Sequence, residues 1–290
     1  MHKFLRAIGF SDITKKDLEM ILDEVITRPE IMKITKDSEG NEFAELSGSF
    51  AANAGITVRG TYQEDDSFHM DYYYPYVFGT SITTNEQIDV EKHAEKESYA
   101  GVCDEVNLGV TLIFYIQNVA DYLAETNRHL SKIHYGAMLA GLSTEGKILC
   151  PVVERKKNDV PAIQKNDRHN QLIAQAREGD EDAIESLTLE DMDTYALLSQ
   201  RVMKEDIFSI VKSTFMPFGI ESDQYTVLGE IIDCVTMENK LTHEKLYGMK
   251  LLCNNIQFDV CINEKDLLGE PAIGRRFRGN VWMQGNLCSD

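Results

Sequence analysis

The sequence predicts an α+β protein with an N-terminal antiparallel-sheet domain, a helical middle segment and a small β-rich C-terminal domain. The strands of the C-terminal domain could form a barrel. One segment near the N-terminus has apolar residues at helical spacing, and short alternating segments separated by turn sequences follow it. The fractions of hydrophobic residues (43%) and charged residues (27%) are typical of a globular protein. Because 290 residues exceed the usual size of one domain, we divide the chain at residues 1–153, 154–218 and 219–290.

The N-terminal unit should begin with a helix. A capping sequence runs from Thr14 to Asp17, apolar residues at helical spacing follow it, and Arg28-Pro29 ends it. Turn sequences such as Asp37-Ser-Glu-Gly40 then predict hairpins, and Ser143-Thr-Glu-Gly146 predicts one more. We expect a short helix at 119–126 and strands at 31–36, 42–47, 55–63, 67–78, 98–104, 109–117, 133–142 and 147–153.

The middle segment differs in composition from what precedes it. Charged residues after Glu154, followed by Pro161, predict an exposed linker. A second capping sequence runs from Thr188 to Asp191. Carboxylates gather here without the spacing of a calcium-binding loop, so we interpret them as a solvated helix surface. Helices are expected at 166–177, 180–186, 189–203 and 207–215, and the carboxylates are Glu178, Asp180, Glu181, Asp182, Glu185, Glu190, Asp191 and Asp193.

The C-terminal unit is expected to be a compact set of strands. Pro217-Phe-Gly219 closes the helical part, and Asn254-Asn255 suits a tight hairpin turn. Such strands would fit a small barrel, of which the oligonucleotide-binding fold is one example. We expect strands at 224–235, 246–252, 256–262 and 279–287, with a short helix at 265–268.

The charge of the chain excludes some classes of partner. The formal net charge is −19, from 48 carboxylates against 29 Lys and Arg, and it repels phosphate backbones and anionic membranes. The longest apolar run, Val110 to Ile116, is too short to cross a bilayer. We therefore expect a cytoplasmic protein that binds neither nucleic acid nor membrane.

The cysteines indicate reduced thiols. They are scattered, without metal-ligand spacing, and most lie in apolar segments, so we expect them reduced and mostly buried. We expect no metal and no cofactor, and the chain contains no catalytic motif whose mechanism can be stated. The six are Cys103, Cys150, Cys234, Cys253, Cys261 and Cys288.

Positive charge collects in one C-terminal segment. Arg275, Arg276 and Arg278 lie between Gly274 and Gly279. Guanidinium groups bind phosphate or carboxylate through paired hydrogen bonds, and glycines allow a ligand to approach the backbone. The alternative is that these arginines form ion pairs with the many carboxylates of the chain.

Two aromatic features are candidates for contacts with a partner. Trp282 alternates with apolar neighbours, which is typical of a core, although base stacking is an alternative. Tyr72, Tyr74 and Tyr76 alternate on one strand, where they would form either core or a subunit interface. Pro75 indicates an edge strand, because proline donates no backbone hydrogen bond.

Several segments resemble one protein family, a group from clostridial Firmicutes described as domain of unknown function 3881. The resemblance covers nearly the whole chain, and its C-terminal motif is the most specific part. It implies a bacterial cytoplasmic protein and supplies no activity and no site residues. The segments are Phe4-Leu-Arg-Ala-Ile-Gly-Phe10, Gly179-Asp180 with Leu187-Thr188, Phe215-x-Pro217-x-Gly219, Asn263-x-x-Asp266-Leu-x-Gly-Glu-Pro271 and Gly274-Arg-Arg-Phe277.

Two functional hypotheses follow from the sequence. The first is a non-catalytic binding or assembly protein that recognises a small anionic ligand or a protein partner through the arginine-rich segment, with a homo-oligomer as one form of assembly. The alternative is an enzyme that acts on a small anionic metabolite held by the same arginines. A cleft beside the arginines with a titratable group of shifted pKa would favour the enzyme.

Overall fold

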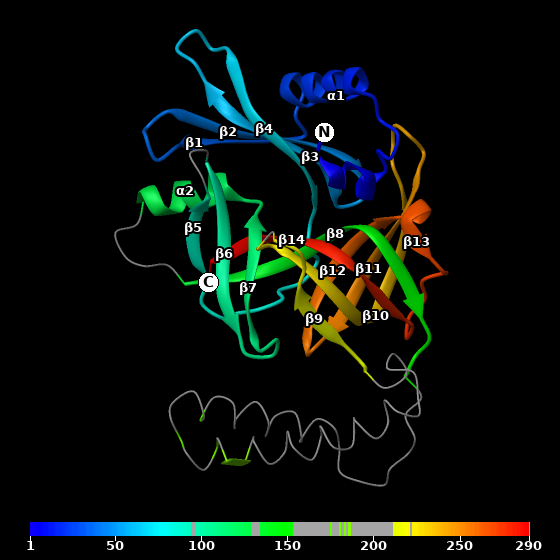
Figure 1. Ribbon diagram of the computed structural model, residues 1–290. Coiled ribbons are helices and arrows are strands. Elements are labelled where there is room, and N and C mark those ends of the chain that lie inside the picture. The colour runs from blue at the N-terminus through cyan, green and yellow to red at the C-terminus, as the bar shows by residue number, and fades with distance from the viewer. Residues whose placement is uncertain are drawn as a thin grey trace.

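The computed structural model describes residues 1–93, 97–128, 134–152, 175, 180, 183, 185–186, 211–220 and 222–289. These residues form mostly β-sheet with few helices (Figure 1), so the chain is α+β or mainly β. The described residues form two sheets, one of four strands and one of ten. Among the helices described, none is long and apolar enough to span a membrane.

The first sheet is an antiparallel meander covered by the N-terminal helix. Buried side chains of α1 pack against β2 and β3. The hydroxyl of Thr14 accepts a hydrogen bond from the backbone N–H of Asp17 at 3.2 Å, which confirms the predicted cap. Strand β4, which contains Pro75, lies at an edge, as predicted. The elements are η1 (Lys3–Ile8), α1 (Lys15–Thr27), β1 (Ile31–Lys36), β2 (Glu42–Ala51), β3 (Ala54–Tyr62) and β4 (Phe68–Val77).

The second sheet contains a closed ring of strands. Its order is β13-β8-β12-β11-β10-β14-β7-β6-β5, with β9 paired to β10. Because β8 also pairs with β14, the strands β8, β12, β11, β10 and β14 close on themselves. The elements are β5 (Asp89–His93), β6 (Ser98–Glu105), β7 (Val110–Ile116), α2 (Val119–Arg128), β8 (Tyr135–Leu149), β9 (Thr214–Pro217), β10 (Gln224–Glu238), β11 (Lys245–Cys253), β12 (Ile256–Asn263), η2 (Glu264–Asp266), β13 (Leu267–Leu268) and β14 (Arg276–Ser289).

Local sequence explains most of the hairpins. The turn between β11 and β12 consists of Asn254 and Asn255, with φ of 46° and 67°. Asparagine tolerates these left-handed angles, and two such residues in a row fit the twist of a tight hairpin, as predicted. The predicted short helix at 119–126 is α2.

The hairpin predicted at Ser143 to Gly146 is wrong, because β8 runs straight through these residues. It pairs with β14 from Tyr135 to Leu149, and a bulge at Asn280/Val281 accommodates the register. The hydroxyl of Ser143 donates to the carbonyl of Asn280 at 2.8 Å. A Cβ at Gly146 would come within 2.4 Å of the Phe277 ring, so glycine serves close packing inside the ring of strands and not a turn.

Other expectations for the C-terminal half had mixed outcomes. The end of the helix predicted at 207–215 is wrong, because Thr214 and Phe215 lie in β9 and pair with β10. The short helix predicted at 265–268 is replaced by η2 followed by β13. The helices predicted at 166–177 and 189–203, the capping sequence at 188–191 and most of the carboxylate group lie outside the described residues.

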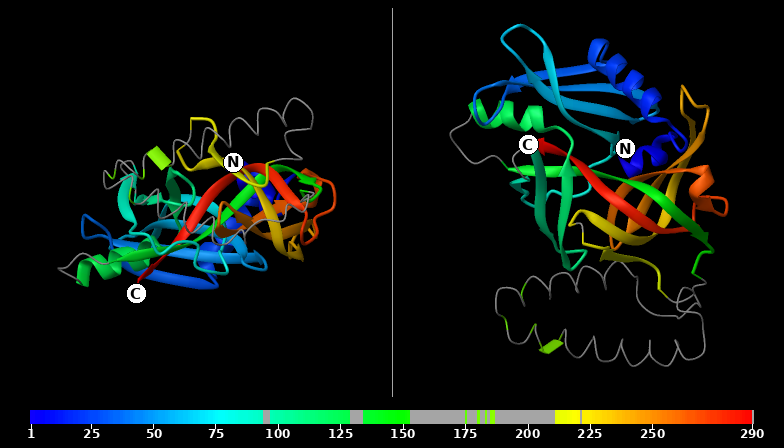
Figure 2. Two further views of the ribbon diagram at one scale, coloured as in Figure 1. Left: turned by 90° about the horizontal axis from the view of Figure 1, so that it is seen from below. Right: turned by 45° about the horizontal axis from the view of Figure 1, so that its top comes forward.

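The expected domain boundary at residue 153 separates strands that share one sheet. Strands β5 to β8 come from the N-terminal side of this boundary, whereas β9 to β14 come from beyond it. Figure 2 shows β8 (green) and β14 (red) running side by side, although they are far apart in sequence. The division at 1–153, 154–218 and 219–290 stays a prediction.

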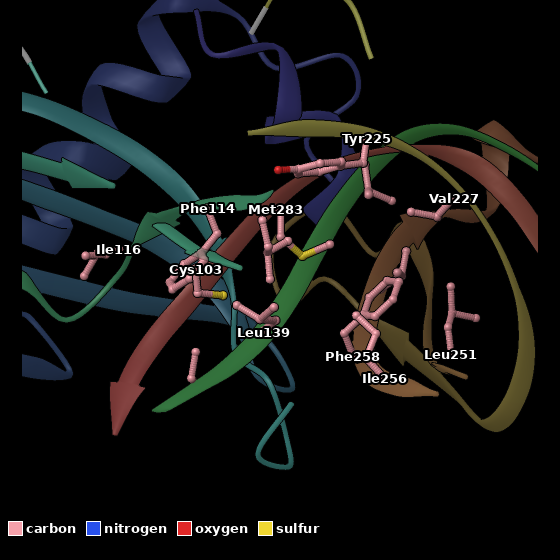
Figure 3. Packing of buried hydrophobic residues seen from close by; sticks show 14 of the residues in the cluster. Cys103, Phe114, Ile116, Leu139, Tyr225, Val227, Leu251, Ile256, Phe258 and Met283 are labelled. Atoms are coloured by element: carbon pink, nitrogen blue, oxygen red, sulfur yellow. The ribbon is translucent and has the colours of Figure 1, made fainter. Parts of the chain in front are cut away.

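Two hydrophobic clusters form the interior of the described residues, and each contains residues of both sheets. One fills the ring of strands and the space beside β6 and β7. Figure 3 shows Val227, Leu251 and Phe258 together in the ring, with Cys103 and Phe114 beside it. The other cluster lies between α1 and the first sheet and reaches Trp282 on β14. This packing brings the first sheet against α2, β7 and β14.

Candidate functional site

A buried arginine joins the first sheet to the second. The side chain of Arg59, on β3, is fully buried. Its guanidinium contacts the Glu45 carboxylate at 2.6 Å. It also donates to the hydroxyl of Tyr115 at 2.7 Å and to the backbone carbonyls of Ile116 and Gln117 at 3.0 and 2.9 Å. One side chain of the first sheet therefore holds the end of β7 in the second.

Three tyrosine rings surround this guanidinium. Its Cζ lies 4.8 Å from the ring centroid of Tyr74, 5.3 Å from Tyr115 and 5.8 Å from Tyr72. Burial alone would lower the pKa of Arg59. The surrounding hydroxyls and the Glu45 carboxylate outweigh burial and raise the pKa well above its ordinary value, so the group stays charged.

Glu45 extends the same network to helix α2. Its Oε1 accepts from Arg59, and its Oε2 accepts from the backbone N–H of Ala120 at 3.0 Å. That N–H belongs to the first turn of α2, where backbone donors lack partners within the helix and the dipole favours an anion. The carboxylate thus fixes the start of α2 against β2.

A pocket of about 320 Å³ lies beside this network, between the first sheet and the strands β8 and β14. The hydroxyls of Ser47 and Thr57 are 2.8 Å apart at its inner wall, and both residues are buried. Its apolar lining comes from Ile31, Phe78, Met138 and Leu287. Its polar lining comes from Lys33, Glu45, Ser47, Thr57, Gln117, Asn118, Asp121 and Asn286.

Among the described residues of this lining, one buried polar atom lacks a hydrogen-bond partner, the side-chain amide oxygen of Gln117. The side chain is 5% exposed, and its amide nitrogen donates to the carbonyl of Val77 at 2.9 Å and to Oε1 of Gln284 at 2.8 Å. Its own Oε1 is buried and accepts no hydrogen bond from any described residue. Leaving a buried acceptor without a hydrogen bond lowers the free energy of unfolding by about 1–3 kcal/mol.

An ion pair stands at the mouth of the pocket. The ammonium of Lys33, on β1, lies 2.6 Å from the carboxylate of Asp121, on α2, and the two side chains are 41% and 44% exposed. Because the lysine and the aspartate neutralise each other, the pocket presents no unpaired cation at its rim.

The arginine-rich segment lies elsewhere, and its residues have different environments. Arg276 is 5% exposed and donates to the carbonyls of Cys150 at 2.9 Å and Val211 at 2.6 Å. Burial lowers its pKa. Arg275 is exposed and donates to the carbonyl of Glu270 at 2.7 Å. Arg278 is half-buried. At least two of the three arginines thus bind backbone carbonyls of the chain itself.

The aromatic candidates are mostly interior. Trp282 is 6% exposed; its ring stacks on Phe4 at 5.3 Å, and its N–H donates to Asp223 at 2.7 Å. Tyr74 and Tyr76 are each 2% exposed, so little of either side chain is open to a partner. Tyr72 is half-buried and donates to the carbonyl of Glu97 at 2.7 Å.

The cysteines show no disulfide, and their environments vary. Cys103, Cys253 and Cys261 are buried, and burial raises the pKa of each to about 12. Cys234 and Cys288 are half-buried, and Cys150 is exposed. Three of the six cysteines are therefore buried, so the expectation that most are buried holds only in part. Within the described ranges no cluster of His, Cys, Asp and Glu has the geometry of a metal site.

The pocket and its buried arginine were not found from the sequence. Arg59 alternates with apolar residues on β3, which is also the pattern of a solvent-facing strand residue. The available signal for the buried arginine was a group of tyrosines opposite a charged residue in neighbouring strands. The lining of the pocket comes from segments separated by up to 256 positions, from Ile31 to Leu287. Such a convergence has no local signature.

Comparison with known proteins gives one match. The family model described as "Domain of unknown function, E. rectale Gene description (DUF3881)" matches residues 5–285, which is nearly the whole chain. Neither the curated proteins nor the solved structures gave a match.

Proposed function

We propose that this chain, which belongs to the DUF3881 family, binds a small, uncharged polar molecule and does not transform it. The proposed binding site is the pocket between its two sheets. The observation that carries this proposal is the buried Oε1 of Gln117, an acceptor without a partner among the described residues. A ligand that brings an N–H or O–H group to this oxygen relieves the cost of leaving it unpaired.

The size and lining of the pocket favour a small ligand. About 320 Å³ is near the lower end of the range for small-molecule sites, which is about 300–1,000 Å³. Phe78, Met138 and Leu287 offer apolar surface to the body of the ligand. The Gln117 oxygen is buried, so a ligand donor reaches it only if the side chains around it move.

The charges in the lining favour a neutral ligand over an anion. Among the described residues of the lining, Lys33 is the only cation, and it is already paired with Asp121 at 2.6 Å. Glu45 adds a second carboxylate, which the buried Arg59 neutralises. An anionic metabolite would have to separate the Lys33–Asp121 pair, whereas a neutral donor leaves it intact.

The same features argue against catalysis in this pocket. Its described lining contains no histidine and no cysteine, and its carboxylates are engaged with Arg59 and Lys33. The bonds from Arg275 and Arg276 to backbone carbonyls support a structural role for the arginine-rich segment. We therefore place binding in the pocket rather than at these arginines.

Three probes of similar shape test the proposal. Benzamide offers an N–H donor, acetophenone lacks it, and benzoate carries a negative charge. We expect benzamide to bind with a Kd in the millimolar range, which corresponds to a binding free energy of about 4 kcal/mol. It should perturb the methyl resonance of Met138 and bind more tightly than both analogues. The substitution Met138→Trp should fill the pocket and abolish binding, whereas Met216→Trp, at a residue 55% exposed on β9, should not.

Several results would contradict the proposal. Equal binding of benzamide and acetophenone would show that the Gln117 acceptor plays no part. Preferential binding of benzoate would favour an anion site instead. No binding of benzamide at about 10 mM, or unchanged binding by Met138→Trp, would remove the pocket as the site.

A further inference from the structure

A second hollow lies on the other side of the first sheet, between α1 and the loop that joins β10 to β11. Its volume is about 540 Å³. Figure 1 shows this loop (yellow to orange) beside the N-terminal residues (blue). Phe10 and Ile21 are buried at its base, whereas Met20 on α1 is 63% exposed and Leu241 on the loop is 49% exposed. We call this hollow the α1 groove.

The walls of the α1 groove are fixed in place. Asn239 is fully buried, and its amide nitrogen donates to the carbonyl of Ile8 at 2.7 Å. Its Oδ1 accepts from the backbone N–H of Leu241 at 2.9 Å. Gly9 has φ of 92°, and a Cβ there would come within 2.6 Å of Asn239. The backbone at Leu241 is therefore held in place, which lowers the entropic cost of ordering the loop when a partner binds.

The rim of the α1 groove is acidic, and no lysine or arginine belongs to the part of its lining that the structure describes. Lys265, outside the lining, contacts Glu244 at 2.7 Å and Asp12 at 3.3 Å. Asp17 and Glu24 make no ion pair with any residue that the structure describes. The rim thus combines two unpaired carboxylates, on α1, with apolar side chains that face solvent.

From this combination we propose that the α1 groove docks a basic amphipathic segment of a partner protein. Apolar side chains of that segment would pack between Met20 and Leu241, and its Lys or Arg side chains would meet Asp17 and Glu24. A second copy of the chain would bring another acidic surface toward this rim, because the chain carries a net charge of −19. An anionic membrane is repelled for the same reason.

The test uses two designed peptides with the same pattern of leucines at helical spacing. One has lysine at its polar positions, and the other has glutamate. Binding is followed by fluorescence anisotropy at about 0.15 M salt and by the methyl resonance of Met20 in the full chain. We expect the Leu/Lys peptide to bind and to shift the Met20 signal, and the Leu/Glu peptide to do neither.

Matched variants separate docking from adsorption to an acidic surface. Glu24→Lys and Leu241→Asp lie in the groove, whereas Glu64→Lys lies at the β3–β4 turn and Leu268→Asp lies on β13, where the residue is 74% exposed. Glu24→Lys and Glu64→Lys change the net charge equally. We expect the groove variants to weaken binding of the Leu/Lys peptide about tenfold, which corresponds to a change in binding free energy of about 1.4 kcal/mol. The control variants should weaken its binding less than about twofold.

The proposal is overturned by any of four outcomes. Equal weakening by Glu24→Lys and Glu64→Lys would mean nonspecific adsorption. Binding of the Leu/Glu peptide would remove the electrostatic argument. Absence of Leu/Lys binding at about 100 µM would mean that the groove does not dock such a segment. Self-association that Leu241→Asp abolishes would identify a second copy as the occupant.

Discussion

At the scale of single residues, Arg59 carries an unusual share of the tertiary contacts. From β3, its guanidinium reaches Glu45, three tyrosine hydroxyls and two backbone carbonyls, which belong to β2, β4 and the end of β7. A buried charge is tolerated only when its donors are satisfied. The network therefore specifies how the two sheets meet, and it sets the inner wall of the pocket.

Replacing Arg59 by methionine should be strongly destabilising. The change leaves the Glu45 carboxylate, 4% exposed, without its cation, and breaking a buried pair in this way costs about 3–5 kcal/mol. Arg59→Lys keeps the charge but loses the planar fork, so an intermediate loss is expected. Urea unfolding followed by circular dichroism gives the free energy of unfolding of each variant.

The control for this prediction is an exposed pair. Lys245 and Glu264 are 2.7 Å apart with side chains 44% and 50% exposed, and exposed pairs of this kind contribute little to stability. Lys245→Met should therefore have a small effect. If Arg59→Met lowered the free energy of unfolding no more than Lys245→Met, the role of Arg59 in holding the sheets together would be disproved. If Arg59→Met does not fold, Arg59→Lys provides the comparison.

At the scale of elements, local sequence was a good guide where neighbours in the chain also pair in space. The strand at Ile31–Lys36 was predicted at its observed bounds, and the Asn254-Asn255 turn occurs where expected. The prediction was wrong at β8, where Gly146 resembles a turn residue but lies opposite Gly279 on β14. Strand β9 was missed because its partner, β10, determines it.

Arg276 binds two segments that lie far from it in the sequence, so its replacement should affect stability. It donates to the carbonyl of Cys150, just after β8, and to that of Val211, shortly before β9. Arg276→Ala leaves these acceptors without this donor, and we expect a loss of about 1–3 kcal/mol. Arg275→Ala, at an exposed side chain, should stay within about 0.5 kcal/mol. Thermal unfolding of both variants measures the difference.

The same pair of variants tests the ligand hypothesis for the arginine-rich segment. If these arginines bind an anion, phosphate or citrate should raise the melting temperature of the wild type but not that of Arg276→Ala. If they are structural, the anions should shift both proteins equally. An Arg276→Ala variant as stable as the wild type would contradict the structural role.

At the scale of the whole molecule, the sequence predicted an α+β protein, which agrees in part with the observed α+β or mainly β structure, but it did not predict how the strands close. The ring forms only because β14 lies between β8 and β10, while Gln284 and Gly285 of β14 also pair with β7. Composition and alternation predict that strands exist, but they do not state which distant strands pair. The pocket depends on that closure, since its lining includes Met138 of β8 and Asn286 of β14.

A ring of five strands raises the question of nucleic-acid binding, and we expect none at about 0.15 M salt. The net charge of −19 opposes it, and three clustered arginines are few beside the roughly six to ten phosphate contacts of a typical binder. A stacking platform needs an open aromatic face. The ring of Trp282 is instead covered by His2 at 4.8 Å and Phe4 at 5.3 Å, and its N–H is directed to the Asp223 carboxylate.

Fluorescence anisotropy with a labelled random single-stranded oligonucleotide should stay flat into the micromolar range. Micromolar affinity that falls with added salt and is lost in Trp282→Phe would mean that the tryptophan leaves its place in the core to stack on bases.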